Sequence, residues 1–415
     1  MFNLRALDKF SPMFRSRIIG LATCFVLAFS ILVPVQPVWS IAGSKCSTLE
    51  TTKVVSKRHF TCRTIDGVKT WTPTLPPNFG KAYNAQVGAT CPRLGSLYWE
   101  GMARVECVMV KGKLVYQIKK YPKTSKEVKK VDSLFKRLEI RTDIDFAKYK
   151  QSIRLEPGYE DLLWARDSIG GIDSAIQLLY TLGAEPIRPI PFFIFWNFDY
   201  AQPRLPSYCA SWANLGGGGV CSTELIFVNL GWFARSGNHY KNDPNSYQDD
   251  TQRLLLIGNM QHEVGHFGQI SEFFRVQGRM DGGLNADQDL RPAWLREGAV
   301  EFFKMLAYAN QFKLQYSEAR NIWIHNNGNR CTSTSLRDLL EPKTYHGNLC
   351  EYNNGLLAVE LLVAKTGDLR SIFRWDDQIG ENSGMTQAQA FRSVFGLDFE
   401  TFLKEGDKYI QQETA

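Results

Sequence analysis

The sequence contains no Cys-x-x-Cys pair, although it has nine cysteines. Such pairs are the usual framework of a zinc ribbon, so their absence argues against that kind of site. The chain also carries no recognisable RNA- or DNA-binding motif. Its formal net charge is +7, and part of this charge lies in an N-terminal segment that we expect to be removed. The mild basicity that remains does not indicate a nucleic-acid partner.

The first residues have the pattern of an export signal. A basic stretch at 5–17 precedes a nearly continuous apolar run at 18–33, and small residues then permit cleavage before Gly43. We therefore expect a signal peptide at 1–42 and a protein that is secreted or held at the cell surface. The alternative is an uncleaved membrane anchor, although the apolar run is short for a full span.

The cysteines outside this segment agree with export. Eight of them remain, an even number, and disulfides persist in oxidising compartments. Sequence alone does not fix their connectivity. The simplest arrangement joins neighbours along the chain: Cys46–Cys62, Cys91–Cys107, Cys209–Cys221 and Cys331–Cys350.

An internal repeat follows the signal. Gly-x-x-Cys begins at Gly43 and again at Gly88, and in each copy a second cysteine, a glycine and an aromatic residue follow at matching places. The two units, 43–75 and 88–120, are too small to hold a large core, so a disulfide in each is reasonable. They resemble short β modules with Cys and Trp that are appended to exported bacterial proteins. That resemblance implies attachment to a cell-envelope polymer, and the alternative is a plain spacer.

The pattern within the repeats predicts hairpins. Alternating residues predict short strands at 58–62 and 104–108, and Asp66-Gly67 and Lys111-Gly112 predict the turns. A lysine-rich linker, 121–156, follows the second repeat and is expected to hold an amphipathic helix near 131–140.

A larger domain is expected at 157–415. Helical spacing covers 160–182 and ends at Gly183, and aromatic or β-branched runs predict strands at 191–198 and 224–230. The glycines from Gly216 to Gly219 predict a flexible loop. Further helices are predicted at 250–277, 292–312, 354–366, 386–395 and 398–412. Strands followed by helices indicate the α+β class.

The segment His262-Glu263-Val264-Gly265-His266 has the pattern His-Glu-x-x-His within a predicted helix. At about 3.6 residues per turn, both histidines lie on one face and can bind one metal ion. Glu263 projects beside them and can accept a proton from water. Zinc needs a third protein ligand and keeps a fourth position for water. The alternative is coincidence, since a pattern of this length arises by chance in about one such chain in a hundred.

A candidate third ligand lies on the next predicted helix. Its segment Trp294-Leu295-Arg296-Glu297-Gly298 resembles that of the gluzincin metallopeptidases, the superfamily of thermolysin and the zinc aminopeptidases. The resemblance implies Zn²⁺ on His262, His266 and Glu297. It also implies that Glu301, one turn further on, hydrogen-bonds a ligand histidine, which would fix the tautomer and orientation of the ring. The alternative, two solvated helix acids, fits poorly among apolar neighbours.

A third stretch, Tyr352-Asn353-Asn354-Gly355, resembles the Tyr-x-x-Gly helix start of aminopeptidase-type gluzincins. The resemblance implies that the Tyr352 hydroxyl stabilises the tetrahedral intermediate. His346 is the rival oxyanion donor, and His325 is a weaker one. The catalytic residues expected from the sequence are thus Glu263 and Tyr352.

One family segment is missing. Aminopeptidase members carry Gly-x-Met-Glu-Asn, whose glutamate binds the free amine of the substrate, and 217–224 occupies the comparable place here without it. Glu224 is a candidate amine binder without further support. The strand at 224–230 is expected to border the cleft and pair with extended substrate. The missing segment slightly favours an endopeptidase.

The sequence therefore predicts an exported zinc peptidase with a gluzincin-like catalytic domain after two β modules. Its expected partners are a peptide or protein substrate and, through the repeats, an envelope polymer, with no nucleic acid. A membrane would be a partner only if the N-terminal segment stays uncleaved. Two other classes remain open: a peptidase fold without activity, and a surface-binding protein that acts through its repeats.

Overall fold

The computed structural model describes most of the chain after residue 43, and the predicted signal peptide at 1–42 lies outside the described part. The described residues are 44–55, 58–65, 68–74, 87–91, 94–95, 97–100, 103–118, 124–146, 149, 152–157, 163–195, 198–213, 218–221, 225–230, 250–277, 291–327, 331–341, 350–378 and 384–414. Contacts divide the chain into two compact units, with the boundary between Thr74 and Leu75. None of the described helices is long and apolar enough to cross a membrane.

The two repeats form three-stranded antiparallel sheets with the same strand order. The first sheet has the order β1-β2-β3 and the second β4-β5-β6. Their strands are β1 (Thr52–Val55), β2 (Arg58–Ile65), β3 (Val68–Thr74), β4 (Leu97–Glu100), β5 (Ala103–Val110) and β6 (Lys113–Ile118). The expected strands are therefore confirmed: 58–62 is the first part of β2, and 104–108 lies in the middle of β5.

Equivalent hydrogen bonds hold the first cysteine of each repeat. The backbone N–H of Cys46 donates to the carbonyl of Lys69 at 3.0 Å, and that of Cys91 donates to Leu114 at 3.1 Å. The turn between β5 and β6 has φ of 49° at Lys111 and 77° at Gly112, as a two-residue hairpin turn with two positive φ angles requires. The predicted turn at 111–112 is thus confirmed, whereas 66–67 lies outside the described residues.

Three of the four neighbour pairings are confirmed as disulfides. Cys209 is also disulfide-bonded, but the side chain of Cys221 lies outside the described part. Disulfides indicate an extracellular or otherwise oxidising compartment. The confirmed bonds join Cys46–Cys62, Cys91–Cys107 and Cys331–Cys350.

The linker helix α2 (Lys126–Lys136) begins and ends earlier than the predicted 131–140. The Oγ atom of Ser125 accepts a hydrogen bond from the backbone N–H of Val128 at 3.4 Å, which caps the first turn. Val128 and Val131 are buried, whereas most of the neighbouring lysines face solvent. The helix therefore starts inside the lysine-rich stretch that sequence analysis assigned to the linker.

A four-stranded sheet begins the larger domain. Its order is β7-β8-β10-β9, with β7, β8 and β10 parallel and β9 antiparallel to β10. The long helix α4 (Leu163–Leu182) connects β7 to β8, and Gly183 follows it with φ of 72°. The strands are β7 (Ile153–Leu155), β8 (Phe192–Phe195), β9 (Gly218–Cys221) and β10 (Leu225–Asn229).

Two expectations about this sheet were wrong. Gly218 and Gly219, expected in a flexible loop, form the first half of β9, where Gly219 pairs with Phe227 of β10. The strand predicted at 224–230 is confirmed as β10, but β10 pairs with β8 on one side and β9 on the other, so it is not open to pair with extended substrate as expected. Strand β9 ends the described sheet instead. The pairing partner fixes the glycine backbone, and that partner is not visible in the local glycine-rich sequence. Glu224 lies outside the described residues.

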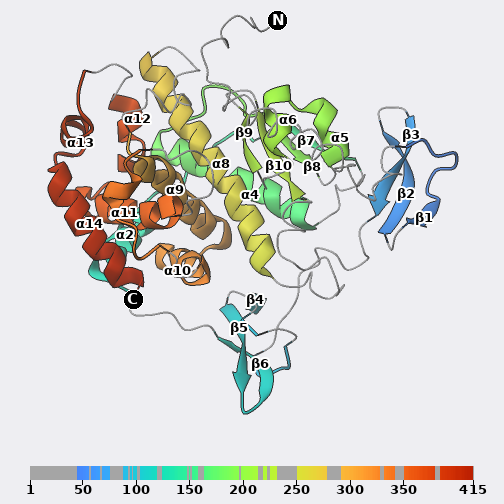
Figure 1. Cartoon of the computed structure of the whole chain (residues 1–415), viewed down its shortest axis with the longest axis horizontal. Helices are drawn as coiled ribbons and strands as arrows, with labels where there is room; N and C mark the ends of the chain where they lie inside the picture. Colours follow the sequence, from blue (N-terminus) through green and yellow to red (C-terminus); the bar gives the residue numbers. More distant parts are fainter. Residues whose placement is uncertain are drawn as a thin grey trace, which may run out of the picture. The chain divides into compact units, whose positions relative to one another are not determined.

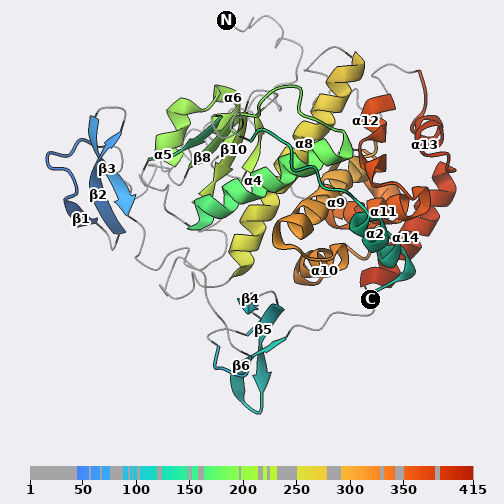
Figure 2. The same ribbon diagram turned by 180° about the vertical axis from the view of Figure 1, so that it is seen from behind.

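Helices dominate the rest of the domain, so the fold is mixed α and β. The long helix α8 packs against α4, α9, β9 and β10, and in both views it runs between the sheet and the C-terminal helices (Figures 1 and 2). The long helices are α8 (Asp250–Gln277), α9 (Ala293–Phe312), α10 (Tyr316–Asn327), α11 (Cys350–Thr366), α13 (Gln387–Phe395) and α14 (Phe399–Thr414). Shorter ones are α5 (Phe198–Ala201), η2 (Gln202–Arg204), α6 (Ser207–Ala213), η4 (Leu336–Leu339), η5 (Leu369–Ile372) and α12 (Arg374–Gln378).

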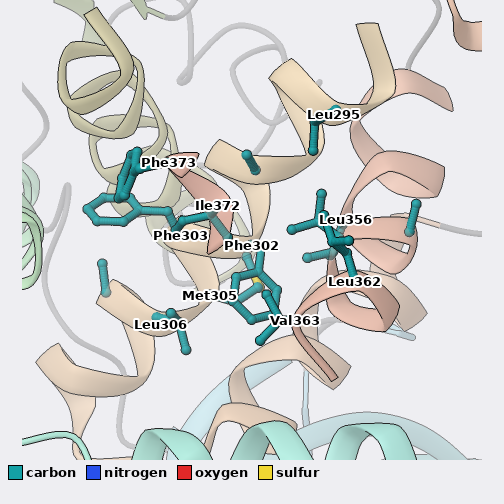
Figure 3. Packing of buried hydrophobic residues seen from close by; sticks show 14 of the residues in the cluster. Leu295, Phe302, Phe303, Met305, Leu306, Leu356, Leu362, Val363, Ile372 and Phe373 are labelled. Atoms are coloured by element: carbon teal, nitrogen blue, oxygen red, sulfur yellow. The ribbon is translucent and has the colours of Figure 1, made fainter. Parts of the chain in front are cut away.

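Helices α9 and α11 form the centre of the core. Apolar side chains of both helices interdigitate there, among them Phe302 of α9 and Leu356 of α11 (Figure 3). The two backbones touch at Gly298 and Gly355: a Cβ atom at Gly298 would lie 2.3 Å from the carbonyl carbon of Gly355. These are the glycines of the Trp-Leu-x-Glu-Gly and Tyr-x-x-Gly segments, so the close approach brings the two motifs together.

Candidate metal centre

Helix α8 presents the two histidines of the His-Glu-x-x-His motif side by side. The Nε2 atoms of His262 and His266 lie 3.0 Å apart, and their ring centroids are 4.6 Å apart. His262 is buried, and His266 is partly exposed. Gly265 between them lets α9 approach closely, since a Cβ atom there would lie only 3.0 Å from Phe303 and 3.1 Å from Val300.

Helix α9 adds a carboxylate to the two imidazoles. The Oε2 atom of Glu297 lies 3.3 Å from Nε2 of His266 and 3.5 Å from Nε2 of His262. Oε2 is buried and accepts no hydrogen bond from the described residues. The other oxygen, Oε1, accepts a hydrogen bond from Nε of Arg296 at 3.0 Å. Glu297 thus directs one buried oxygen without a hydrogen bond at the two histidines.

The three atoms have the spacing of ligands around one metal ion. Ligand bonds of about 2.0–2.15 Å in a tetrahedral site separate the ligand atoms by roughly 3.3–3.5 Å. The three separations here run from 3.0 to 3.5 Å. The His262–His266–Glu297 group can therefore bind a metal ion. Two imidazoles and one carboxylate suit zinc and other transition metals better than Mg²⁺ or Ca²⁺.

Each ligand histidine is oriented through its second ring nitrogen. Nδ1 of His262 donates to Oε1 of Glu301 at 2.8 Å, and Nδ1 of His266 lies 3.1 Å from Oε1 of Gln269. Gln269 is itself held, because its Nε2 donates to the carbonyl of Arg296 at 3.1 Å. Protons on both Nδ1 atoms leave the Nε2 lone pairs free to bind a metal.

The role of Gln269 was not predicted from the sequence. Its only sequence signal is a polar side chain one turn after His266 in a helix whose surrounding residues are buried. Helical spacing predicts that such a residue can reach the preceding imidazole. The hydrogen bond to Arg296 of α9 depends on helix packing, so it is apparent only in the folded structure.

The site brings several carboxyl groups together in a buried environment. Burial by itself raises the pKa of Glu297, but His266, His262 and Arg296 lower it well below its usual range. Burial opposes protonation of His262, yet the neighbouring carboxylates of Glu297 and Glu301 raise its pKa to about 10. Glu263 is buried on the same helix, and burial raises the pKa of its carboxyl despite the nearby histidines. The arrangement favours a cation among the carboxylates.

Helix α11 contributes the other candidate side chains. It begins at Cys350 and not near 354, so Tyr352 lies in its first turn. The Tyr352 ring lies beside His262, with centroids 5.5 Å apart and planes inclined at 32°. Glu351 is buried next to it, and burial and the charge of Glu297 raise the pKa of its carboxyl. Glu351 was not among the residues predicted from the sequence.

The described structure does not test the remaining candidates. His346 lies outside the described residues, and so does the side chain of His325. No protein-family model, curated protein or solved structure matches the chain. The resemblance to gluzincins therefore rests on the motifs themselves.

Proposed function

We propose that the protein is a zinc-dependent hydrolase of peptide bonds, of the gluzincin type. The observation that carries the proposal is the convergence of His262, His266 and Glu297 with a carboxylate, Glu263, on the same helix. The three ligand atoms lie 3.0 to 3.5 Å apart. A buried acid directly after the first ligand is the arrangement in which a general base acts on water beside the metal.

The proposed chemistry divides between the metal and the protein. Zinc held by this group supplies a Lewis acid that polarises a carbonyl and lowers the pKa of water to about 7. Glu263 accepts the proton of the attacking water and later delivers it to the leaving amine. Glu301 and Gln269 hold the histidine rings so that their Nε2 atoms keep facing the ion.

Tyr352 is proposed as the oxyanion donor. Its ring lies beside His262, with centroids 5.5 Å apart, at the start of α11. A hydroxyl at this edge of the metal group can donate to an oxygen that becomes negative as water attacks the carbonyl. Cys350, two residues before it, is joined to Cys331, which fixes the start of the helix.

The sheet supports a peptide as substrate. Strand β9 ends the described sheet and packs against α8, the helix that carries the two histidines. An extended peptide can add to such an edge through its backbone hydrogen-bonding groups. The absence of Gly-x-Met-Glu-Asn favours an endopeptidase. Export by the N-terminal signal agrees with the disulfides and is part of the proposal.

The second candidate is a binding protein that keeps a peptidase fold without activity, with the repeats making the cell-surface contacts. The intact ligand group and the buried Glu263 favour the enzyme, because a fold that has lost its activity has no need of them. Both candidates can bind zinc, so only turnover separates them.

A substitution at Glu263 tests the proposal. The wild type is expected to bind one zinc ion and to cleave a proteome-derived peptide library until a zinc chelator is added. Glu263→Gln should keep the zinc and lose cleavage, because the ligands are intact and the base is gone. Metal content by mass spectrometry and cleavage by peptide sequencing are the two measurements.

Glu272→Gln is the matched control. Glu272 is also buried on α8, but it pairs with Arg275 and Arg370 and not with the ligand group. This variant should keep both zinc and cleavage while circular dichroism shows it folded. Cleavage by Glu263→Gln, or the loss of its zinc, would refute the assignment.

A further inference from the structure

A buried lysine completes the set of side chains around Glu301. Nζ of Lys304 lies 2.5 Å from Oε2 of Glu301, and Lys304 is only 5% exposed. The other oxygen of Glu301, Oε1, accepts the hydrogen bond from Nδ1 of His262 at 2.8 Å. Both carboxylate oxygens are therefore engaged, one by a ligand histidine and one by the lysine.

The lysine is held in place from its other side. Its Nζ atom lies 3.8 Å from the centroid of the Trp323 ring, at the distance of a cation–π contact. Trp323 of α10 packs in turn on Gly258 of α8, where a Cβ atom would lie 2.3 Å from the indole. Helices α8, α9 and α10 thus meet around the Lys304 ammonium group, and Gly258 provides the space for the Trp323 indole.

The buried ion pair between Lys304 and Glu301 is costly to form, which points to a role other than stability. Burying an ion pair removes two charges from water, and apolar side chains of similar volume often serve stability as well or better. Lys304 lies one turn after Glu301 on α9, so the two charges form a local pair that leads to the metal group. An ionised Glu301 with a fixed orientation is what a ligand histidine needs from its partner.

We propose that Lys304 is a positioning residue for metal binding, which acts through Glu301 on His262. Its ammonium group supplies the positive charge that stabilises the Glu301 carboxylate in its buried place. By holding Oε2 it directs Oε1 at Nδ1 of His262, and Nε2 of the same ring then faces Glu297 and His266. The inference rests on the metal-binding part of the proposed function.

The test is a double-mutant cycle on zinc affinity. The full chain, stripped of metal, competes for zinc with a fluorescent chelator of known affinity. Lys304→Met should weaken zinc binding about 10- to 100-fold, as the loss of other outer-shell partners does. Glu301→Gln should weaken it by a similar factor. In the Glu301→Gln background, Lys304→Met should add no further loss, because the lysine acts only through the carboxylate.

A second readout reports the geometry of the site without turnover. Co²⁺ in place of zinc gives a visible spectrum that depends on the arrangement of its ligands. Lys304→Met and Glu301→Gln are expected to shift this spectrum in the same way, since both release the His262 ring. Should Lys304→Met fail to fold by circular dichroism, Lys304→Gln, which keeps a polar group of similar reach, takes its place in the same cycle.

Arg320→Met is the matched control for the loss of a buried cation. Arg320 is 4% exposed and pairs with Glu360, which also accepts hydrogen bonds from Tyr316 and Tyr409 at 2.6 Å each. This variant should lose stability but keep the zinc affinity of the wild type in its folded state.

The outcomes separate the two proposals. A wild type that binds no zinc overturns both of them. Tight zinc binding by the wild type together with equal affinity in Lys304→Met overturns only the role of Lys304. An equal loss from Lys304→Met in both backgrounds also overturns it, because the lysine would then act independently of Glu301.

Discussion

Replacing Gly298 by alanine tests the packing that unites the two motifs. A Cβ atom at Gly298 would lie 2.3 Å from the carbonyl carbon and oxygen of Gly355 and 2.6 Å from its Cα. Ordinary contact needs roughly 1 Å more, and the opposing atoms are backbone, so α9 and α11 have to separate. Overpacking of this kind costs about 1–3 kcal/mol, and a clash with backbone places Gly298→Ala at the upper end.

Alanine at a second glycine separates the effect of the backbone contact from the effect of helix propensity. Alanine is favoured over glycine inside a helix by about 0.5–1 kcal/mol, wherever the helix lies. Gly170 in α4 faces only the amide end of Gln311, at 3.3 Å from a built Cβ atom, and that side chain can move. Gly170→Ala should therefore be neutral or slightly stabilising. The free energies of unfolding of the two variants should differ by about 3 kcal/mol, because their propensity gains cancel.

Urea denaturation of both variants, followed by circular dichroism with the disulfides intact, measures this difference. Gly298 directly follows Glu297, and Gly355 lies one turn after Tyr352, so separation of the helices also displaces the site. Misplacement by about 1 Å can cost about 100-fold in rate, so folded Gly298→Ala should lose most of its activity. A free energy of unfolding within about 1 kcal/mol of that of Gly170→Ala would refute the close backbone contact.

Three further predictions concern side chains around the site. Gln269→Leu should weaken zinc binding about tenfold in chelator competition, because the His266 ring loses its partner; unchanged affinity would count against that role. Tyr352→Phe should retain zinc while its rate of peptide cleavage falls about 100- to 1,000-fold, and a rate equal to that of the wild type would exclude the hydroxyl as oxyanion donor. Replacing Cys331 and Cys350 by serine opens a loop of sequence separation 19 and should lower the free energy of unfolding by about 3 kcal/mol in urea; a change below about 1 kcal/mol would contradict this estimate.

Local patterns were the most informative part of the sequence. The two repeats show their strands and one of their turns as expected, because hairpins and short-range disulfides depend on neighbours in the chain. The helix around His262 was also predictable, since its spacing and length are local properties. Predictions were wrong where a distant partner decides the conformation. Gly218 and Gly219 form a strand because β10 supplies their hydrogen bonds.

The starts of the helices also differ in whether a local signal or a distant contact sets them. α2 begins at Lys126 because Ser125 caps it, a local signal that sequence analysis did not use. α11 begins at Cys350, where the disulfide to Cys331 holds its first turn, and its start could not be read from helical periodicity. α10 was not predicted because its apolar residues show only a weak helical spacing. Its burial comes from packing against α9 and α2.

The sequence by itself determined the spacing of His262 and His266, because both lie one turn apart on a single helix. It also pointed to Glu297 and Glu301, but only through a resemblance between motifs. The tertiary structure alone decided that Glu297 lies within 3.5 Å of both imidazoles, that Gln269 contacts His266 and Lys304 contacts Glu301, and that two glycines let α9 and α11 touch. These features depend on distances between separate helices, and such distances are set by the packing of the whole core.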